Sequence, residues 1–222
     1  MLDADIKQQL SQYLQLLEGD VLIKVSASSD DAVSNDMLAF LEELAGMSPR
    51  ITTEKAQLAR TPSFSVNRVG EDTGIVFAGI PLGHEFTSLV LALLQVSGRA
   101  PKVEQSVIDQ IKSIKGNYAF ESYVSLSCHN CPDVVQALNV MSVLNPGISH
   151  TMIDGAAFKD EVESKDILAV PSVFLNGEFF GSGRMSLEEI IAKISDSPDA
   201  SEFEGKEPFD VLVIGGGPAG AS

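Results

Sequence analysis

The 222-residue sequence has only two cysteines, few basic residues and no long apolar run. Its 15 basic residues against 31 acidic ones give a formal net charge of −16, which argues against a nucleic-acid partner, because phosphates require Lys and Arg. The longest apolar-rich run, residues 89–96, is much shorter than the roughly 18 residues of a membrane helix. The acidic N-terminus shows no secretory signal. We therefore expect a cytoplasmic protein that does not bind membranes, in which two cysteines are too few for a disulfide framework.

Helical and strand patterns alternate along the chain, which predicts an α/β fold. The length allows two small domains, and the apolar fraction of 44% is ample for their cores. The last predicted helix begins with a capping box, Ser186 followed by Glu189. Apolar spacing predicts helices near residues 6–17, 32–45, 84–96, 103–114, 131–144 and 187–194, and strands near 21–25, 51–53, 63–66, 75–78, 119–124, 149–153, 172–175 and 178–180.

The second half of the chain repeats the order of the first. The opening helix of each half stops at a glycine, Gly19 and then Gly116, and the segment 61–64 (Thr-Pro-Ser-Phe) matches 170–173 (Val-Pro-Ser-Val). We therefore predict two similar units, residues 1–99 and 100–195.

The last part of the sequence changes character. Residues 196–208 are acidic and rich in Ser and Pro, which is typical of an exposed linker. Residues 209–222 resemble a buried strand that runs into a G-x-G-x-x-G motif at Gly215, Gly217 and Gly220, the beginning of a dinucleotide site. The helix and the later acidic residue of such a site are absent, so we expect a fragment that cannot bind the dinucleotide by itself.

The motif Cys128-His129-Asn130-Cys131 follows a predicted strand and opens a predicted helix. Unpaired N–H groups at a helix start stabilise a thiolate, so Cys128 is expected to attack disulfides and Cys131 to resolve the mixed disulfide. His129 either adds positive charge that favours the thiolate or is an exposed residue without a role. The motif predicts thiol–disulfide exchange.

Other uses of the two cysteines fit less well. Structural zinc usually needs four ligands, and beyond the cysteines only His84, His129 and His150 are present, so no metal is expected. A c-type haem motif would have His where Pro132 stands. A disulfide across so short a loop is a poor structural staple. Pro171 is a candidate cis proline facing the cysteines, with an ordinary strand-start proline as the alternative.

Two long strings carry a family resemblance. Residues 123–143 (Tyr-Val-Ser-Leu-Ser-Cys-His-Asn-Cys-Pro onwards) and 81–94 (Pro-Leu-Gly-His-Glu-Phe onwards) resemble the N-terminal domain of the flavoprotein subunit of bacterial alkyl hydroperoxide reductase, and the likeness covers the whole chain. The resemblance implies two fused thioredoxin-like folds, with mixed sheets flanked by helices, of which only the second keeps its cysteines. Residues 26–30 of the first fold read Ser-Ala-Ser-Ser-Asp instead.

The resemblance also implies a function. Electrons would pass from NADH to FAD, to a distal disulfide, to Cys128 and Cys131, and then to the disulfide of a peroxiredoxin. The glycine motif would open the FAD-binding domain of a full-length homodimer that binds FAD and NADH, neither being expected on this fragment. Glu85 matches a glutamate to which the family assigns an acid/base role. A free-standing glutaredoxin-like protein disulfide oxidoreductase and a docking module with incidental cysteines are the alternatives.

Overall fold

The computed structural model describes residues 4–195, so the expected linker and the glycine motif lie outside the described residues. Its helices are α1 (Ala4–Leu14), α2 (Ala32–Gly46), the 3₁₀ helix η1 (Gly83–Glu85), α3 (Phe86–Val96), α4 (Gln105–Ser113), α5 (Cys131–Leu144), α6 (Lys159–Ser164) and α7 (Leu187–Ser195). Its strands are β1 (Val21–Ser26), β2 (Ile51–Lys55), β3 (Ser63–Arg68), β4 (Glu71–Ala78), β5 (Tyr118–Val124), β6 (Ile148–Asp154), β7 (Ser172–Leu175) and β8 (Glu178–Ser182).

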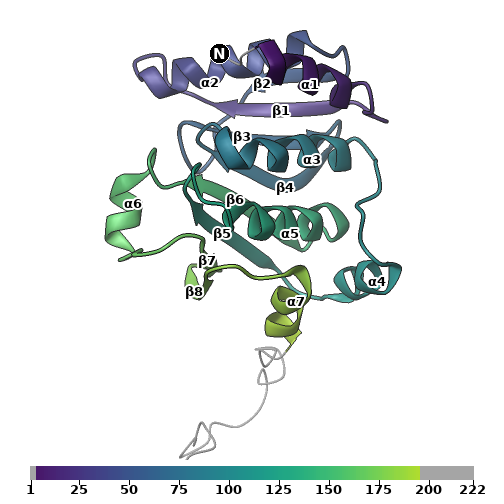
Figure 1. Cartoon of the computed structure of the whole chain (residues 1–222), viewed down its shortest axis with the longest axis vertical. Helices are drawn as coiled ribbons and strands as arrows, with labels where there is room; N and C mark the ends of the chain where they lie inside the picture. The colour runs from purple at the N-terminus through teal and green to yellow at the C-terminus, as the bar shows by residue number, and fades with distance from the viewer. Residues whose placement is uncertain (1–3, 196–222) are drawn as a thin grey trace, which may run out of the picture.

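All eight strands form one sheet in the order β2-β1-β3-β4-β6-β5-β7-β8 (Figure 1). In the first half β1 pairs parallel with β2 and antiparallel with β3, and β3 pairs antiparallel with β4. The second half repeats this pattern with β5, β6, β7 and β8. The structure therefore confirms the predicted repeat, and it adds that the strands of the two halves join into one sheet through the parallel pair β4–β6.

Most predicted elements are present. The structure differs from the prediction at three helices. Helix α6 was not predicted, because it has six residues and none of them is buried, so it leaves no apolar periodicity. Helix α1 ends at Leu14 because the next N–H groups, those of Leu16 and Leu17, bond to carbonyls only three residues back. The helix predicted from His84 is divided into η1 and α3. The capping box is confirmed, since Ser186 and Glu189 exchange side chain-to-backbone hydrogen bonds.

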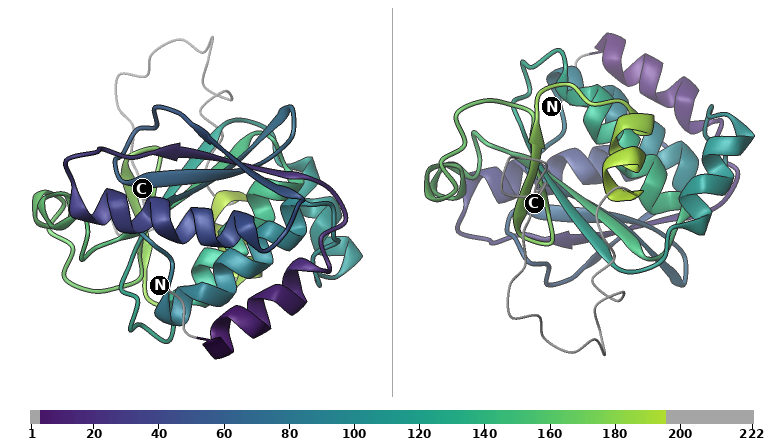
Figure 2. Two further views of the ribbon diagram at one scale, coloured as in Figure 1. Left: turned by 90° about the horizontal axis from the view of Figure 1, so that it is seen from above. Right: turned by 90° about the horizontal axis from the view of Figure 1, so that it is seen from below.

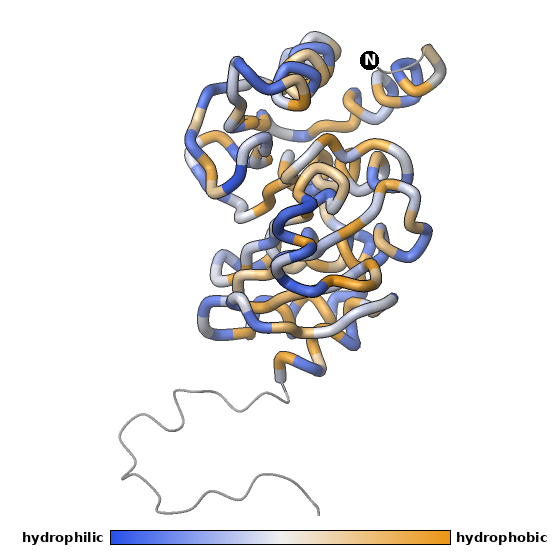
Figure 3. The backbone as a smooth tube through the Cα atoms, turned by 90° about the vertical axis from the view of Figure 1, so that its left-hand side faces the viewer, coloured by the Kyte–Doolittle hydropathy of each residue, from blue (hydrophilic) through white to orange (hydrophobic). Residues whose placement is uncertain are grey.

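Helices α3 and α5 pack against each other, α3 on β3 and α5 on the strands β4, β5 and β6. Helices α4 and α6 lie at opposite ends of the strands (Figures 1 and 2). Figure 3, which faces the end that carries α6, shows hydrophobic and hydrophilic segments alternating along the backbone. Among residues 4–195 no helix is long and apolar enough to cross a membrane.

The two halves share part of their core. The largest buried cluster consists mainly of first-half residues, but it also contains Val124, Cys131, Val135 and Met152 of the second half. A second cluster, which includes Phe120, Leu138 and Ile190, belongs to the second half alone. Burying a large apolar side chain stabilises a fold by about 1.5–3 kcal/mol, so the shared cluster holds the halves together.

An ion-pair cluster also joins the halves. Arg60, just before β3, donates from Nε and Nη2 to the carboxylate of Glu161 in α6, with Nε–Oε1 at 2.9 Å and Nη2–Oε2 at 2.8 Å. Its Nη2 also bonds to Oε1 of Glu121 in β5 at 2.6 Å. Because this Arg side chain is only 15% exposed, water screens the pairs less than at an open surface.

Candidate functional site

Cys128 and Cys131 form a disulfide between the end of β5 and the start of α5, with their Cα atoms 5.5 Å apart. Strand β5 ends at Val124, and the backbone N–H of Cys128 bonds to the carbonyl of Ser125, which closes a tight turn. Pro132 follows in the first turn of α5, where its missing N–H leaves no helix bond unmade. The structure therefore shows the oxidised form of the predicted motif.

The environments of the two sulfur atoms differ. Cys128 is partly exposed, whereas Cys131 is fully buried in the core cluster that the two halves share. The backbone N–H of Cys131 donates to Sγ of Cys128 at 3.2 Å, and no side chain caps the start of α5. The helix start therefore directs N–H groups and a positive partial charge at the accessible sulfur, which favours its thiolate form once reduced.

Pro171 lies opposite this disulfide. The Val170–Pro171 peptide bond is cis, and the carbonyl oxygen of Val170 is 3.8 Å from Sγ of Cys128. The Thr61–Pro62 bond is also cis, at the start of β3, the strand of the first half that corresponds to β7. The two matching Pro-Ser pairs are visible in the sequence, but this second cis bond was not predicted from them.

The 3₁₀ helix η1 brings the first half to the disulfide of the second. The backbone N–H of His84 donates to the carbonyl of Leu126 at 3.0 Å, in the turn that precedes Cys128. Gly83 has a φ of 57°, and a Cβ at this position would lie 2.5 Å from the same carbonyl oxygen. Only glycine permits so close an approach without displacing the backbone. This contact therefore fixes η1 beside the redox loop, residues 125–130 between β5 and α5.

Glu85 is the last residue of η1, and its side chain is fully buried. Neither carboxylate oxygen has a hydrogen-bond partner within residues 4–195. Burial raises the pKa of Glu85 to about 7 from its ordinary 4.5, while the nearby hydroxyl of Ser88 acts weakly in the opposite direction. Such a carboxyl group can take up or release a proton near neutral pH. From the sequence, Glu85 was a candidate only through the family resemblance.

The three histidines lie in two places. The rings of His84 and His129, both exposed, have centroids 4.1 Å apart, so the redox loop meets η1 through these side chains. His150 is fully buried, with Nε2 2.8 Å from Oγ of Ser122 and Nδ1 2.7 Å from Oδ1 of Asn139. Burial lowers the pKa of His150 to about 3, so its ring is neutral and structural. Within the described part of the chain no three His, Cys, Asp or Glu side chains are arranged to hold a metal ion.

A disulfide at a helix start in a thioredoxin-like unit defines the class of this chain, a thioredoxin-like domain of the disulfide oxidoreductase type. The family model described as a thioredoxin domain matches residues 121–196, the half that carries the cysteines. Among solved structures, a protein disulfide oxidoreductase from Aeropyrum pernix has a TM-score of 0.77 at 21% identity, covering 89% of this chain and 94% of that one. That likeness shows the fold of the chain, two fused thioredoxin-like units.

The NTD_N/C domain of alkylhydroperoxide reductase AhpF from Enterococcus faecalis is more similar in sequence. It is 31% identical with a TM-score of 0.82, covering 87% of this chain and 100% of that chain. This chain therefore belongs to the family of AhpF N-terminal domains.

Curated relatives extend the likeness to the whole sequence. A protein of Bacillus subtilis named NADH dehydrogenase is 74% identical over all 222 residues, and the alkyl hydroperoxide reductase AhpF of Staphylococcus aureus is 61% identical over the same length. The chain spans 43% of the length of each relative.

Proposed function

We propose that this domain is the thiol–disulfide relay of a peroxiredoxin reductase, passing electrons through Cys128 and Cys131 to the disulfide of a peroxiredoxin. The observation that supports this most is the contrast between the two sulfur atoms. One is accessible and accepts a hydrogen bond from the N–H of Cys131 at the helix start, and the other is buried. Membership in the AhpF family supports the hydroperoxide context.

The chemistry takes two exchange steps. The thiolate of Cys128 attacks one sulfur of the partner's disulfide, forming a mixed disulfide and releasing the partner's other sulfur as a thiolate. Cys131 then attacks Sγ of Cys128, which reforms the intramolecular disulfide and releases the second partner thiolate. The partner gains two electrons, and the domain loses two.

Glu85 would act in the second step as a proton acceptor. Cys131 must lose its proton before it attacks, and because it is buried, water has little access to it. A carboxyl group with a pKa of about 7 is suited to take this proton at neutral pH and to return it when the disulfide is reduced again. Its place on η1, which packs against α5, supports this role.

The electron source would lie in the part of the longer relatives beyond this chain. The resemblance assigns FAD and NADH to that part of a homodimeric protein, and one relative is named NADH dehydrogenase. Gly215, Gly217 and Gly220, the expected start of the FAD site, lie outside the described residues. In this proposal the two cysteines carry out thiol–disulfide exchange and Glu85 transfers a proton, whichever group supplies the electrons.

Trapping tests the proposal. Cys131→Ser cannot resolve the mixed disulfide, so it should accumulate a covalent adduct between Cys128 and an oxidised peroxiredoxin, detected by non-reducing electrophoresis and mass spectrometry. Cys128→Ser is the matched control and should form no adduct. An adduct formed only through Cys131 would reverse the two roles. Full electron transfer by Cys128→Ser would instead favour a docking module with incidental cysteines.

A free-standing protein disulfide oxidoreductase is the second candidate, because the Aeropyrum pernix protein with that name has the same double fold. Acceptor preference distinguishes the two. The relay should reduce an oxidised peroxiredoxin much faster than an unrelated protein disulfide such as insulin, whereas a general oxidoreductase should reduce both at similar rates.

A further inference from the structure

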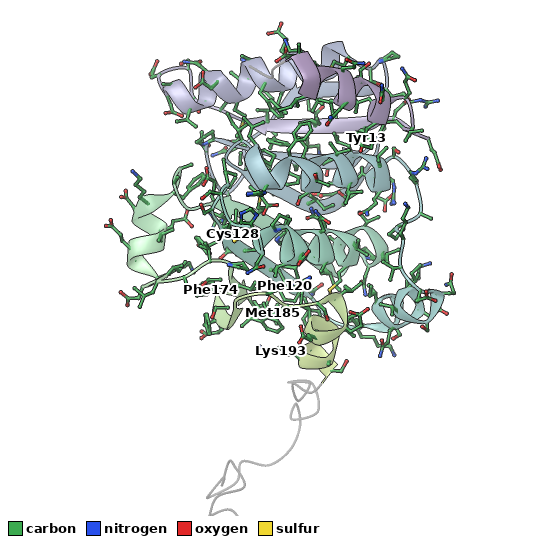
Figure 4. All side chains as sticks on the ribbon, in the orientation of Figure 1. Tyr13, Phe120, Cys128, Phe174, Met185 and Lys193 are labelled. Atoms are coloured by element: carbon green, nitrogen blue, oxygen red, sulfur yellow. A yellow bond between two sulfur atoms is a disulfide. The ribbon has the colours of Figure 1, made fainter. Side chains whose placement is uncertain are left out.

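An exposed apolar ridge, residues 168–170 (Leu-Ala-Val), lies next to the accessible sulfur. Leu168 is 98% exposed, and Val170 is 37% exposed. The carbonyl oxygen of Val170 is 3.8 Å from Sγ of Cys128, so the ridge begins at the redox centre. The redox centre lies at the end of the molecule that carries α6 (Figure 4). Single exposed apolar residues are common on protein surfaces, so what distinguishes this ridge is its position beside the accessible sulfur.

The backbone holds the ridge in place at both ends. Ile167 packs into the small cluster around Tyr123 and Phe174, and its N–H bonds to the carbonyl of Val162 in α6 at 3.0 Å. Beyond the ridge, Oγ of Ser172 donates to the carbonyl of Ala169 at 2.7 Å. Leu168 therefore points outward from a loop whose backbone is already ordered. Binding at Leu168 costs little loop entropy for this reason.

We propose that Leu168 is the docking anchor for the acceptor protein and fits an apolar recess beside that protein's reactive disulfide. The geometry of the mixed disulfide brings the acceptor protein over this ridge. In a mixed disulfide the two Cα atoms lie about 4.4–6.8 Å apart, so the acceptor's backbone must pass close to Cys128 and the carbonyl of Val170. Leu168 is only two residues away, at most about 7 Å of chain.

The inference rests on the proposed function and commits to the acceptor rather than to the electron donor. In the longer relatives the donor would belong to the same chain, and such tethering raises its effective concentration without any new contact. An acceptor that arrives from solution has no tether and must gain its affinity from contacts at the site. An exposed leucine beside the reactive sulfur supplies such a contact.

Leu168→Ser in the reduced 222-residue chain tests this proposal. Its second-order rate constant for reducing an oxidised peroxiredoxin in a single turnover should fall about tenfold, which corresponds to about 1.4 kcal/mol. The rate with dithiobis(nitrobenzoate), a small disulfide that needs no docking surface, should stay within about twofold of the wild type. Val69→Ser is the matched control, because Val69 is 65% exposed in the turn between β3 and β4. It should change neither rate.

Three other outcomes would overturn the role of Leu168, and one of them would overturn the proposed function as well. An unchanged second-order rate constant for the peroxiredoxin in Leu168→Ser overturns the anchor and leaves the proposed function intact. An equal fall with both disulfides also overturns it, because the substitution would then act on the sulfur chemistry. A wild-type chain that reduces the small disulfide but no peroxiredoxin overturns both the proposed function and the anchor.

Discussion

The buried carboxyl group of Glu85 should make the folded protein less stable as the pH rises towards neutral. Its pKa is about 7 in the folded chain and near the ordinary 4.5 in the unfolded chain. Between these values the folded state keeps a proton that the unfolded state has lost, so each pH unit lowers the free energy of unfolding by about 1.4 kcal/mol. The full difference in pKa amounts to about 3 kcal/mol, a large share of a typical domain stability of about 5–15 kcal/mol.

Glu85→Gln removes the titration while nearly keeping the size of the side chain. The buried amide has its own cost, but this cost does not depend on pH. The free energy of unfolding of the variant minus that of the wild type should therefore rise by about 3 kcal/mol between pH about 4.5 and about 8. Urea unfolding of the oxidised protein at a series of pH values measures this difference.

Glu178→Gln is the matched control, because this glutamate is exposed on the edge strand β8. Its difference from the wild type should stay within about 0.5 kcal/mol over the same range, as expected for a surface substitution. A pH-independent difference for Glu85→Gln would refute the claim that the carboxyl group is desolvated. A difference that shrinks with rising pH would mean that its pKa is lowered.

The buried His150 and the ion pair between the two halves give further predictions. His150, with a pKa of about 3 when folded and an ordinary 6.5 when unfolded, stays neutral in the fold, so the free energy of unfolding should fall by about 1.4 kcal/mol per unit as the pH drops below 6.5. His150→Gln should lack this loss in acid urea titrations, and parallel curves would contradict the assignment. For the ion pair between the halves, a double-mutant cycle of Arg60→Met and Glu161→Gln should give a coupling energy of about 1–2 kcal/mol in urea unfolding, and a value near zero would mean that the pair does not stabilise the fold.

Local patterns explain why much of the fold was predictable. Apolar spacing depends on the period of each element, so it located the strands and most helices, including α5 with the bounds that the structure shows. The short motif between β5 and α5 predicted a centre of thiol–disulfide exchange, because that chemistry depends on the three-residue spacing of Cys128 and Cys131, and the structure shows their disulfide. Helix α6 left no such pattern, since it buries no side chain.

The sequence by itself therefore determined the α/β class, the repeat and the position of the cysteine pair, all of which follow from local patterns in the chain. The tertiary structure decided which sulfur is accessible, how β4 and β6 join the strands of the two halves into one sheet, and where Glu85 lies. Burial of Glu85 depends on η1 meeting a turn some forty residues later, through Gly83 and the carbonyl of Leu126. The exposure of Leu168 depends likewise on how α6 and β7 hold its loop. Burial, pKa and access are properties of contacts between distant residues, and only the folded chain brings those residues together.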